Sequence, residues 1–251
     1  MRDDLGDHVP RSGRVRRVVS LVPSLTESIA DTGLLVAATD WCTHPAGLDV
    51  ERVRGTKNPN VRRIVELKPD LVLCNQEENR RLDVERLRSA GIPVWVTKIE
   101  TVAAAFASLR RLFTEALAHD VPDWVGAAET AWAQPITQPP RRVVIPIWRD
   151  PWMVVGRNTF TADIASRLGW DCVHATRPDR YPTVTAAELV ADVELAVLPD
   201  EPYVFTETDG PEAFAGIPVA LVSGRELTWY GPSLVHARAS LSAAAARARI
   251  R

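Results

Sequence analysis

Two stretches of the sequence, residues 17–97 and 142–223, share one layout: short apolar runs of strand length that alternate with helical segments. In the first stretch the runs are Val18–Pro23, Leu71–Asn75 and Gly91–Thr97. In the second they are Val143–Trp148, Leu195–Pro199 and Gly216–Val222. Each stretch predicts a small α/β lobe, and two such lobes leave a cleft between them. Because ligands of open α/β sheets bind beyond the carboxyl ends of the strands, this layout favours a small-molecule receptor.

Composition narrows the kinds of partner. A chain of 251 residues can form two small domains, each with its own core. The net charge of −2 gives no reason to expect nucleic acid or an anionic membrane surface as a partner. The longest apolar runs have strand length, so no membrane insertion is expected. We therefore expect a monomer that binds a small molecule.

The first 16 residues are charged and contain no apolar core of the kind that a secretory signal needs. No cysteine near the start could carry a lipid anchor, and the three cysteines (Cys42, Cys74 and Cys172) are an odd number with wide spacing. Free thiols in a reducing compartment explain this pattern better than a disulfide does. The sequence thus predicts a flexible tail and a cytoplasmic location.

The chain divides into four predicted segments: a flexible tail (1–16), an N-terminal α/β lobe (17–118), a bridging helix with a Pro-rich linker (119–140) and a C-terminal α/β lobe (141–251). Ser24 and Glu27 have the spacing of a capping box at the start of a helix. Thr185 or Thr183 is the expected cap of a later helix, and residues 233–250 predict an Ala-rich closing helix.

Eight of the sixteen aromatic residues are tryptophans, and four of them fall on predicted loops or strand ends: Trp41, Trp148, Trp152 and Trp229. Together with Tyr230 they predict a pocket for a flat ligand, because an indole at the edge of a cleft offers a stacking surface. The alternative is that several of these rings pack at the interface of the lobes, where large side chains bury much apolar area.

Several polar residues lie on neighbouring predicted loops. His44 could bind a metal or a corrin cobalt, or serve only as a hydrogen-bond partner. Lys57, Asn58 and Glu77 could bind amide or carboxylate groups at the rim of a ligand, or form a solvated cluster of charges. Arg149 could contact the ligand, or pair locally with Asp150. No cluster of His, Asp and Glu has the spacing of a metal site, so no metal is expected.

Catalytic signatures are missing from the sequence. It contains no Gly-x-Ser-x-Gly motif, no phosphate-binding Gly-x-x-x-x-Gly-Lys motif and no Gly-x-Gly-x-x-Gly turn. We therefore expect no enzymatic activity.

Three motifs carry a resemblance to a known family: the string Arg17–Glu27, the string Ile64–Leu73 (IVELKPDLVL) and the string Gly91–Val96 (GIPVWV). Together they resemble the signatures of the iron/vitamin B12 class (class III, helical-backbone) of ABC-transporter solute-binding proteins, and within it the cobalamin-binding branch. The resemblance covers residues 16–240. It implies two Rossmann-like lobes bridged by an α-helix, with a ligand cleft between the lobes. The implied ligand is cobalamin or another corrinoid, or a ferric chelate, held without a covalent cofactor.

The resemblance also implies positions for the ligand contacts. A stacking aromatic of the first lobe corresponds to Trp41, and a second one corresponds to the polar Asn75. In the second lobe the implied contacts are Tyr181, Trp229 and Tyr230.

Family members dock on membrane subunits through one acidic residue in each lobe. The first of these positions is Arg62 in this chain, and the second is Ala187, next to Glu188. Transporter subunits are therefore an uncertain partner. Two alternatives stay open: an enzyme that acts on tetrapyrroles or metal chelates on the same scaffold, and a regulatory module without a ligand.

Overall fold

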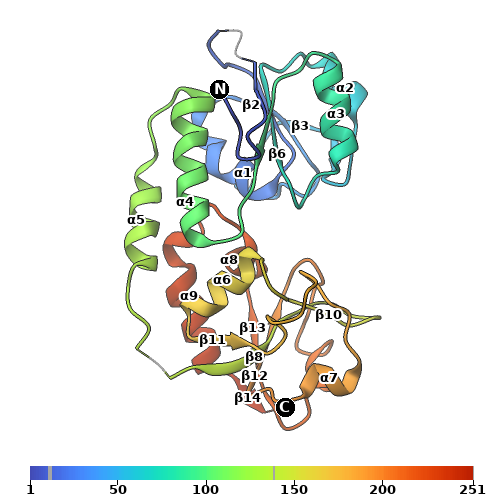
Figure 1. Ribbon diagram of the computed structural model, residues 1–251, viewed down its shortest axis with the longest axis vertical. Helices are drawn as coiled ribbons and strands as arrows, with labels where there is room; N and C mark the ends of the chain where they lie inside the picture. The colour runs from blue at the N-terminus through green and yellow to red at the C-terminus, as the bar shows by residue number, and fades with distance from the viewer. Residues whose placement is uncertain (11–12, 138, 251) are drawn as a thin grey trace. The chain divides into compact units, whose positions relative to one another are not determined.

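The computed structural model describes residues 1–10, 13–137 and 139–250, which form two compact units (Figure 1). Unit 1 comprises Met1–Ile99, Ala104–Val125 and Tyr230–Pro232, and unit 2 comprises Glu100–Ala103, Gly126–Trp229 and Ser233–Arg251. The two predicted α/β lobes are thereby confirmed. The chain passes between the units inside two helices, α4 (Val102–Arg111) and α5 (Asp123–Trp132). The bridge that the sequence predicts, residues 119–140, contains α5 but not α4.

Unit 1 contains a five-stranded parallel sheet in the order β3-β2-β1-β6-β7. Its strands are β1 (Val18–Ser20), β2 (Leu35–Ala38), β3 (Glu51–Arg52), β6 (Leu71–Asn75) and β7 (Val94–Thr97). A separate hairpin consists of β4 (Arg54–Gly55) and β5 (Asn58–Pro59). Each strand of the sheet is short and, apart from β3, largely apolar, as the sequence predicts.

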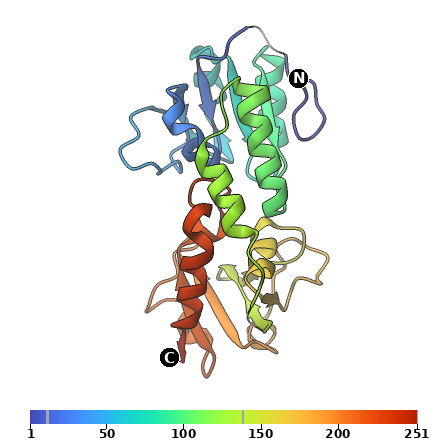
Figure 2. The ribbon, with the colours of Figure 1, turned by 90° about the vertical axis from the view of Figure 1, so that its left-hand side faces the viewer.

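Helices cover both faces of this sheet. Helices α2 (Val61–Glu66) and α3 (Arg81–Ser89) lie on one face, and α1 (Pro23–Ile29) and α4 lie on the other (Figures 1 and 2). Alternate strand residues point toward α2 and α3, because side chains alternate across a strand. These residues are Val19, Val72, Cys74, Val94 and Val96, and they form one buried cluster with Ile64 and Leu87.

The start of α1 differs from the prediction. Its N-cap is Val22, which makes no side-chain capping bond, and Pro23 takes the first helical position. Ser24 therefore lies inside the helix and the expected capping box is wrong. Proline suits this position because its missing N–H would have no intrahelical partner there.

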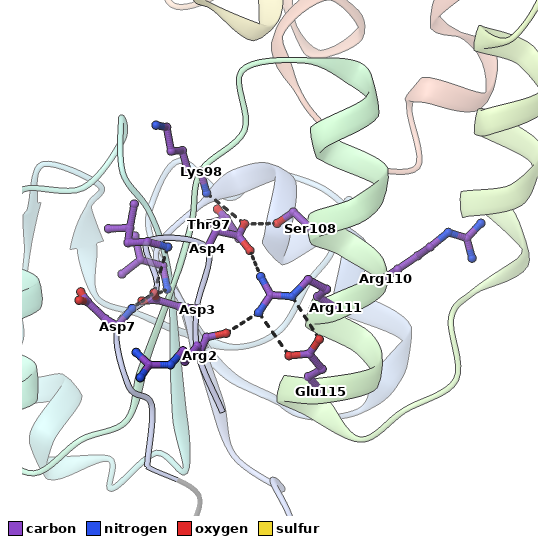
Figure 3. A network of polar contacts seen from close by, with 12 residues as sticks. Arg2, Asp3, Asp4, Asp7, Thr97, Lys98, Ser108, Arg110, Arg111 and Glu115 are labelled. Atoms are coloured by element: carbon purple, nitrogen blue, oxygen red, sulfur yellow. Dashed lines mark hydrogen bonds and ion pairs between the residues drawn. The ribbon is translucent and has the colours of Figure 1, made fainter.

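The N-terminal segment of unit 1 is anchored by carboxylates, in contrast to the flexible tail that the sequence predicts (Figure 3). The side chain of Asp3 is fully buried and pairs with Arg88 at 2.9 Å. Asp4 accepts hydrogen bonds from the hydroxyl of Ser108 and, at 2.7 Å, from Arg111 on α4. The acidic residues Asp3 and Asp4 thus hold the N-terminal segment against the rest of unit 1.

After Arg111 the chain continues as a π-helical segment, η2 (Leu112–Leu117), whose side chains include the buried Phe113. A short 3-10 turn, η1 (Ala30–Thr32), follows α1. The helical stretch from Val102 to Leu117 thus consists of an α-helical and a π-helical segment. Its C-terminal end is Ala118, which adopts a left-handed conformation.

Unit 2 contains a five-stranded sheet in the order β11-β8-β12-β13-β14. Its strands are β8 (Arg141–Val144), β11 (Trp170–Cys172), β12 (Leu195–Pro199), β13 (Pro218–Val222) and β14 (Arg249–Ile250). The first four strands in that order are parallel, and β14 pairs antiparallel with β13. The predicted closing helix over 233–250 is therefore too long, because α9 (Leu234–Ala246) ends before this strand.

The helices of unit 2 also cover both faces of its sheet: α6 (Phe160–Arg167) and α9 lie on one face, and α7 (Ala186–Val190) lies on the other (Figure 1). Thr185 caps α7 with a complete capping box, so the prediction of a cap at Thr185 or Thr183 is confirmed for Thr185. A 3-10 turn, η3 (Pro211–Ala213), and helix α8 (Gly224–Thr228) complete the unit. Among the described residues, no helix is both long and apolar enough to cross a membrane.

Candidate functional site

The parallel strands of each unit bring the segments that follow them to one edge of the sheet, which is where α/β proteins bind ligands. In unit 1 this edge carries the segments after β2 and β6, together with the β4–β5 hairpin. In unit 2 it carries the hairpin of β9 (Pro146–Trp148) and β10 (Met153–Val154), and the segments after β12 and β13. These two edges are the strand-end surfaces of unit 1 and unit 2.

Trp41 is the most exposed large apolar residue among the described residues, with 66% of its surface accessible. It follows β2, and the edge of its indole lies against Gly55 of β4. A Cβ on Gly55 would stand 3.1 Å from Trp41 Nε1 and 2.5 Å from the amide oxygen of Asn58. The glycine thus permits a close approach, and the hairpin supports the indole while leaving much of it open to solvent.

One polar contact joins two loops of this surface, and a second one is local. The ammonium of Lys57 donates to the backbone carbonyl of Glu77, which joins the β4–β5 hairpin to the loop after β6. The Nδ1 atom of His44 lies 3.1 Å from the hydroxyl of the adjacent Thr43. The side chain of Asn58 is exposed. Lys57 and Glu77 are thus joined on the strand-end surface of unit 1, and His44 follows β2 as Trp41 does. Their role as ligand contacts stays a prediction.

Asn75 is buried at the end of β6, whereas Lys57 and Asn58 are exposed. Its side-chain oxygen accepts from the N–H of Glu77 at 2.8 Å, and its side-chain nitrogen donates to the hydroxyl of Thr97 at 3.1 Å. The neighbouring Asn79 was not among the predicted site residues, yet it donates to the carbonyls of Leu21 and Thr56. The side-chain amides of both asparagines therefore hold the loop after β6 in place by buried hydrogen bonds.

Tyr230 belongs to unit 1 and is also buried, with only 5% of its surface exposed. Its hydroxyl donates to a carboxylate oxygen of Glu78 at 3.0 Å. Burial and the nearby charge of Glu78 raise the pKa of Tyr230 well above its ordinary value. The ring therefore offers no open face for stacking in this structure.

The strand-end surface of unit 2 is built from aromatic rings on two segments. Trp148 is 45% exposed and meets the ring of Tyr203 edge-on, with 5.6 Å between the centroids. Trp152 stacks on Phe205 at 6.0 Å and meets the buried Phe214 at 6.1 Å. Trp152 therefore packs against the core of unit 2, whereas Trp148 lies at its surface.

Arg149 lies between these two tryptophans in sequence and contacts three carboxylates. It donates to Asp209 and, at 2.7 Å, to Glu212, and its Nε lies 3.6 Å from Asp150. Its guanidinium also stands 5.3 Å from the ring centre of Trp152. The local Arg149–Asp150 pair that the sequence suggests is present, but the shorter contacts come from residues sixty positions further along the chain.

Hydrogen bonds stabilise the charged form of this cluster. The hydroxyl of Tyr203 donates to Asp209 at 2.7 Å, and this bond and the guanidinium of Arg149 hold the pKa of Asp209 below its ordinary value. Burial raises the pKa of Glu212, but backbone hydrogen bonds and Arg149 outweigh it, so the net shift is also downward. Both carboxylates are therefore ionised at neutral pH.

Trp229 and Tyr181, the other predicted contacts in unit 2, are less open than Trp148. Trp229 is 7% exposed, and its side chain makes a hydrogen bond with Glu201. Burial and the charge of Asp200 raise the pKa of Glu201 to about 7. Tyr181 is half-buried beside β10, since its neighbour Pro182 accepts the N–H of Val154 at 3.1 Å.

The structure therefore sorts the predicted contacts by exposure. Trp41 and Trp148 present open indoles, while Asn75, Trp229 and Tyr230 are buried. Phe205, Asp209 and Glu212 contribute to the unit 2 surface and carried no recognisable signal in the sequence. The described residues contain no group of three or more His, Cys, Asp or Glu that could hold a metal ion. The metal-binding role of His44 stays a prediction.

Arg62, at the first predicted docking position, and Glu188, next to the second, both have local partners. Arg62 lies on α2 and donates to Glu66 at 3.1 Å, with an almost fully exposed side chain. Glu188 forms the capping box of α7 and pairs with Arg177 at 2.5 Å. These hydrogen bonds lower the pKa of Glu188 to about 2.

Comparison with known proteins places these features in context. No family model matches the sequence. A vitamin B12-binding protein of Pectobacterium atrosepticum is 27% identical over 205 residues, which cover 73% of this chain and 71% of that protein. A second relative of the same name, from Pectobacterium carotovorum, is 28% identical over 196 residues, which cover 73% of this chain and 70% of that protein.

Solved structures share the fold. The periplasmic vitamin B12-binding protein of Vibrio cholerae matches with a TM-score of 0.74 at 19% identity, over 92% of this chain and 97% of that one. A periplasmic heme-binding protein of Roseiflexus matches with a TM-score of 0.76 at 20% identity, over 92% and 98% of the two chains. The Helicobacter pylori protein CeuE with bound Ni(II) matches with a TM-score of 0.81 at 15% identity, over 98% and 88%.

These comparisons correct one prediction. Several of the structural neighbours are periplasmic binding proteins, which are exported, so the cytoplasmic location inferred from the first residues is wrong. The relatives are named as binding proteins rather than enzymes. Sequence and fold are both similar to those of vitamin B12-binding proteins, in agreement with the resemblance that the three sequence motifs carry.

Proposed function

We propose that this chain binds a flat, partly apolar small molecule, a corrinoid such as cobalamin, and that exposed indoles at its strand-end surfaces contact the ligand. The observation that carries the proposal is the exposure of one indole on each surface, Trp41 in unit 1 and Trp148 in unit 2. Large exposed aromatics at a sheet edge are typical of ligand sites. The names of the curated relatives support the corrinoid as the first candidate.

In this proposal the two indoles supply apolar stacking area and the polar residues hold the rim of the ligand. Lys57 and Asn58 lie on the hairpin that supports Trp41, and Arg149 adjoins Trp148 in sequence. Their N–H groups can donate to the amide carbonyls that surround a corrin ring. Asn75, Trp229 and Tyr230 act from beneath the surface, by fixing the loops that carry the exposed groups.

We propose in addition that the chain passes its solute to the membrane subunits of a transporter and catalyses no reaction. Similarity to vitamin B12-binding proteins supports the first part, and the naming of the relatives as binding proteins supports the second. Arg62 stands where family members carry a carboxylate, so the partner subunit would need a different charge at that contact.

A metal-bearing porphyrin is the second candidate ligand. It is favoured by the likeness of the fold to solved heme-binding proteins. A heme offers the same flat apolar face to an indole as a corrin does, but its rim carries carboxylates instead of amides. Arg149 and the carboxylates paired with it lie near Trp148, so a charged rim and a neutral rim would interact differently with this surface.

Calorimetric titration tests the proposal directly. Cyanocobalamin is titrated into the purified protein, with hemin and a ferric hydroxamate chelate as parallel ligands. We expect saturable binding of the corrinoid with a dissociation constant of about 1 μM or below. This corresponds to a binding free energy of about −8 kcal/mol or more favourable. Absence of binding up to about millimolar cyanocobalamin, roughly −4 kcal/mol, would exclude the corrinoid.

A further inference from the structure

Three carboxylates surround the guanidinium of Arg149 on the unit 2 surface. Asp209 and Glu212 make direct hydrogen bonds to Arg149, and Asp150 lies 3.6 Å from it. The cluster therefore carries two negative charges in excess. Asp150 and Glu212 are exposed and Asp209 is half-exposed, so this excess charge faces solvent.

The cluster is fixed to the aromatic rings of the same surface. Tyr203 joins the two, because its hydroxyl donates to Asp209 at 2.7 Å while its ring contacts the exposed indole of Trp148. The Arg149 guanidinium stands over Trp152. A molecule that stacks on Trp148 therefore has its rim close to carboxylates whose positions are set by hydrogen bonds.

The chemistry of the ligand rim decides the sign of this interaction. A rim of carboxylates would bring negative charges close to those of Asp209 and Glu212. The energy of this repulsion rises with the inverse of the distance between the charges. A rim of primary amides is neutral, and its N–H groups can donate to the same carboxylate oxygens.

We propose that the cluster of Arg149, Asp150, Asp209 and Glu212 determines specificity: it selects a flat tetrapyrrole with an amide-bearing rim and disfavours one with a carboxylate rim. The inference rests on the proposed function, since it assigns the ligand class of the same site. The residues act by charge and not by shape, so their effect depends on ionic strength.

The test compares two corrinoids with one ring and different rims. Dicyanocobinamide carries amides, and dicyanocobyrinic acid carries carboxylates on every peripheral chain, so the comparison does not depend on which edge faces unit 2. The ratio of their dissociation constants is measured for the wild type and for the double variant Asp209→Asn/Glu212→Gln. We expect the wild type to prefer the amide form, and the double variant to narrow the ratio by about 5- to 25-fold.

A matched control is the double variant Asp192→Asn/Glu194→Gln. It makes the same change in net charge at the opposite edge of the unit 2 sheet, just before β12, where Glu194 accepts the N–H of Arg142 at 2.7 Å. The control should leave the ratio near the wild-type value. Circular dichroism and thermal unfolding of all variants show whether each is folded.

Salt provides a test that needs no variant. The preference of the wild type for the amide form should shrink between about 0.05 M and 1 M NaCl, because the screening length falls to about 3 Å at 1 M. A ratio that is unchanged by salt and by the Asp209/Glu212 variant, or changed equally by the control, would overturn the inference while the binding function stands. If neither corrinoid binds the wild type, the proposed function itself fails.

Discussion

The ring of Tyr203 meets the exposed indole of Trp148 edge-on, with centroids 5.6 Å apart and ring planes at 81°. This arrangement is favourable because the positive edge of one ring faces the negative face of the other. The contact restricts the orientations open to this half-exposed indole. Tyr203 is therefore a positioning residue for Trp148.

Replacing Tyr203 separates this positioning from the hydrogen bond to Asp209. We expect Tyr203→Ala to weaken corrinoid binding by about three- to tenfold, since an edge-to-face pair contributes about 0.5–1.5 kcal/mol. Tyr203→Phe keeps the ring and should retain most of the affinity. Calorimetry on both variants checks this, and equal losses in the two would contradict a role for the ring.

Trp152 should matter for stability more than for binding. It stacks on Phe205 and touches the buried Phe214, so Trp152→Ala leaves a cavity in the aromatic core of unit 2. We expect a loss of about 2–4 kcal/mol in the free energy of unfolding. The half-exposed Trp148 is the matched control, with an expected loss below about 1 kcal/mol for Trp148→Ala. Urea unfolding measures both, and a reversed order would refute the assignment.

Glu201 makes the stability depend on pH. Its folded-state pKa of about 7, raised by burial and by Asp200, lies above the ordinary value of 4.5. The folded protein keeps this proton where the unfolded chain has lost it, so the contribution of Glu201 to stability is greatest below pH 4.5 and falls as pH rises to 7.

The variant Glu201→Gln should remove this dependence. It should be more stable than the wild type by about 1–3 kcal/mol at about pH 8, with little difference at about pH 4. Thermal unfolding of both proteins across this range provides the comparison. A constant difference at all pH values would show that the carboxyl does not titrate in this range. The glutamine can still accept from Trp229, so that contact is retained.

Asp4 anchors the N-terminal segment to α4 in unit 1. Its carboxylate accepts from Ser108, from Arg111 and from the N–H of Lys98 at 3.1 Å (Figure 3). Asp4→Ala should reduce the free energy of unfolding by about 1–3 kcal/mol, because three donors lose their partner. Asp4→Asn keeps an acceptor and should lose less. Protease susceptibility of the first ten residues would rise in the alanine variant, and no change would contradict the anchoring role.

Much of the fold was predictable from local pattern. The apolar runs ending at Asn75 and Thr97 are strands, and the capping signature at Thr185 does begin a helix. The signature at Ser24 failed because Pro23 already provides a suitable first helical residue, so the helix begins earlier. Strand β14 escaped prediction since its pairing with β13 is set by tertiary structure rather than by its own two residues.

The site was less predictable, for two physical reasons. Sequence places an aromatic residue on a loop but does not show whether its ring turns outward, as in Trp41, or inward, as in Trp229 and Tyr230. Ion pairs across the chain are also invisible: Arg149 reaches Asp209 and Glu212 only because the β9–β10 hairpin and the segment after β12 end at the same edge.

The central claim is that a flat ligand binds by stacking on the exposed indoles Trp41 and Trp148. It is tested most directly by measuring cyanocobalamin affinity by calorimetry for the wild type, Trp41→Ala, Trp148→Ala and the double variant. We predict that each single variant loses about 1–3 kcal/mol of binding free energy, as stacked aromatics do elsewhere, and that the double variant loses more than either. Wild-type affinity in both single variants would contradict the claim.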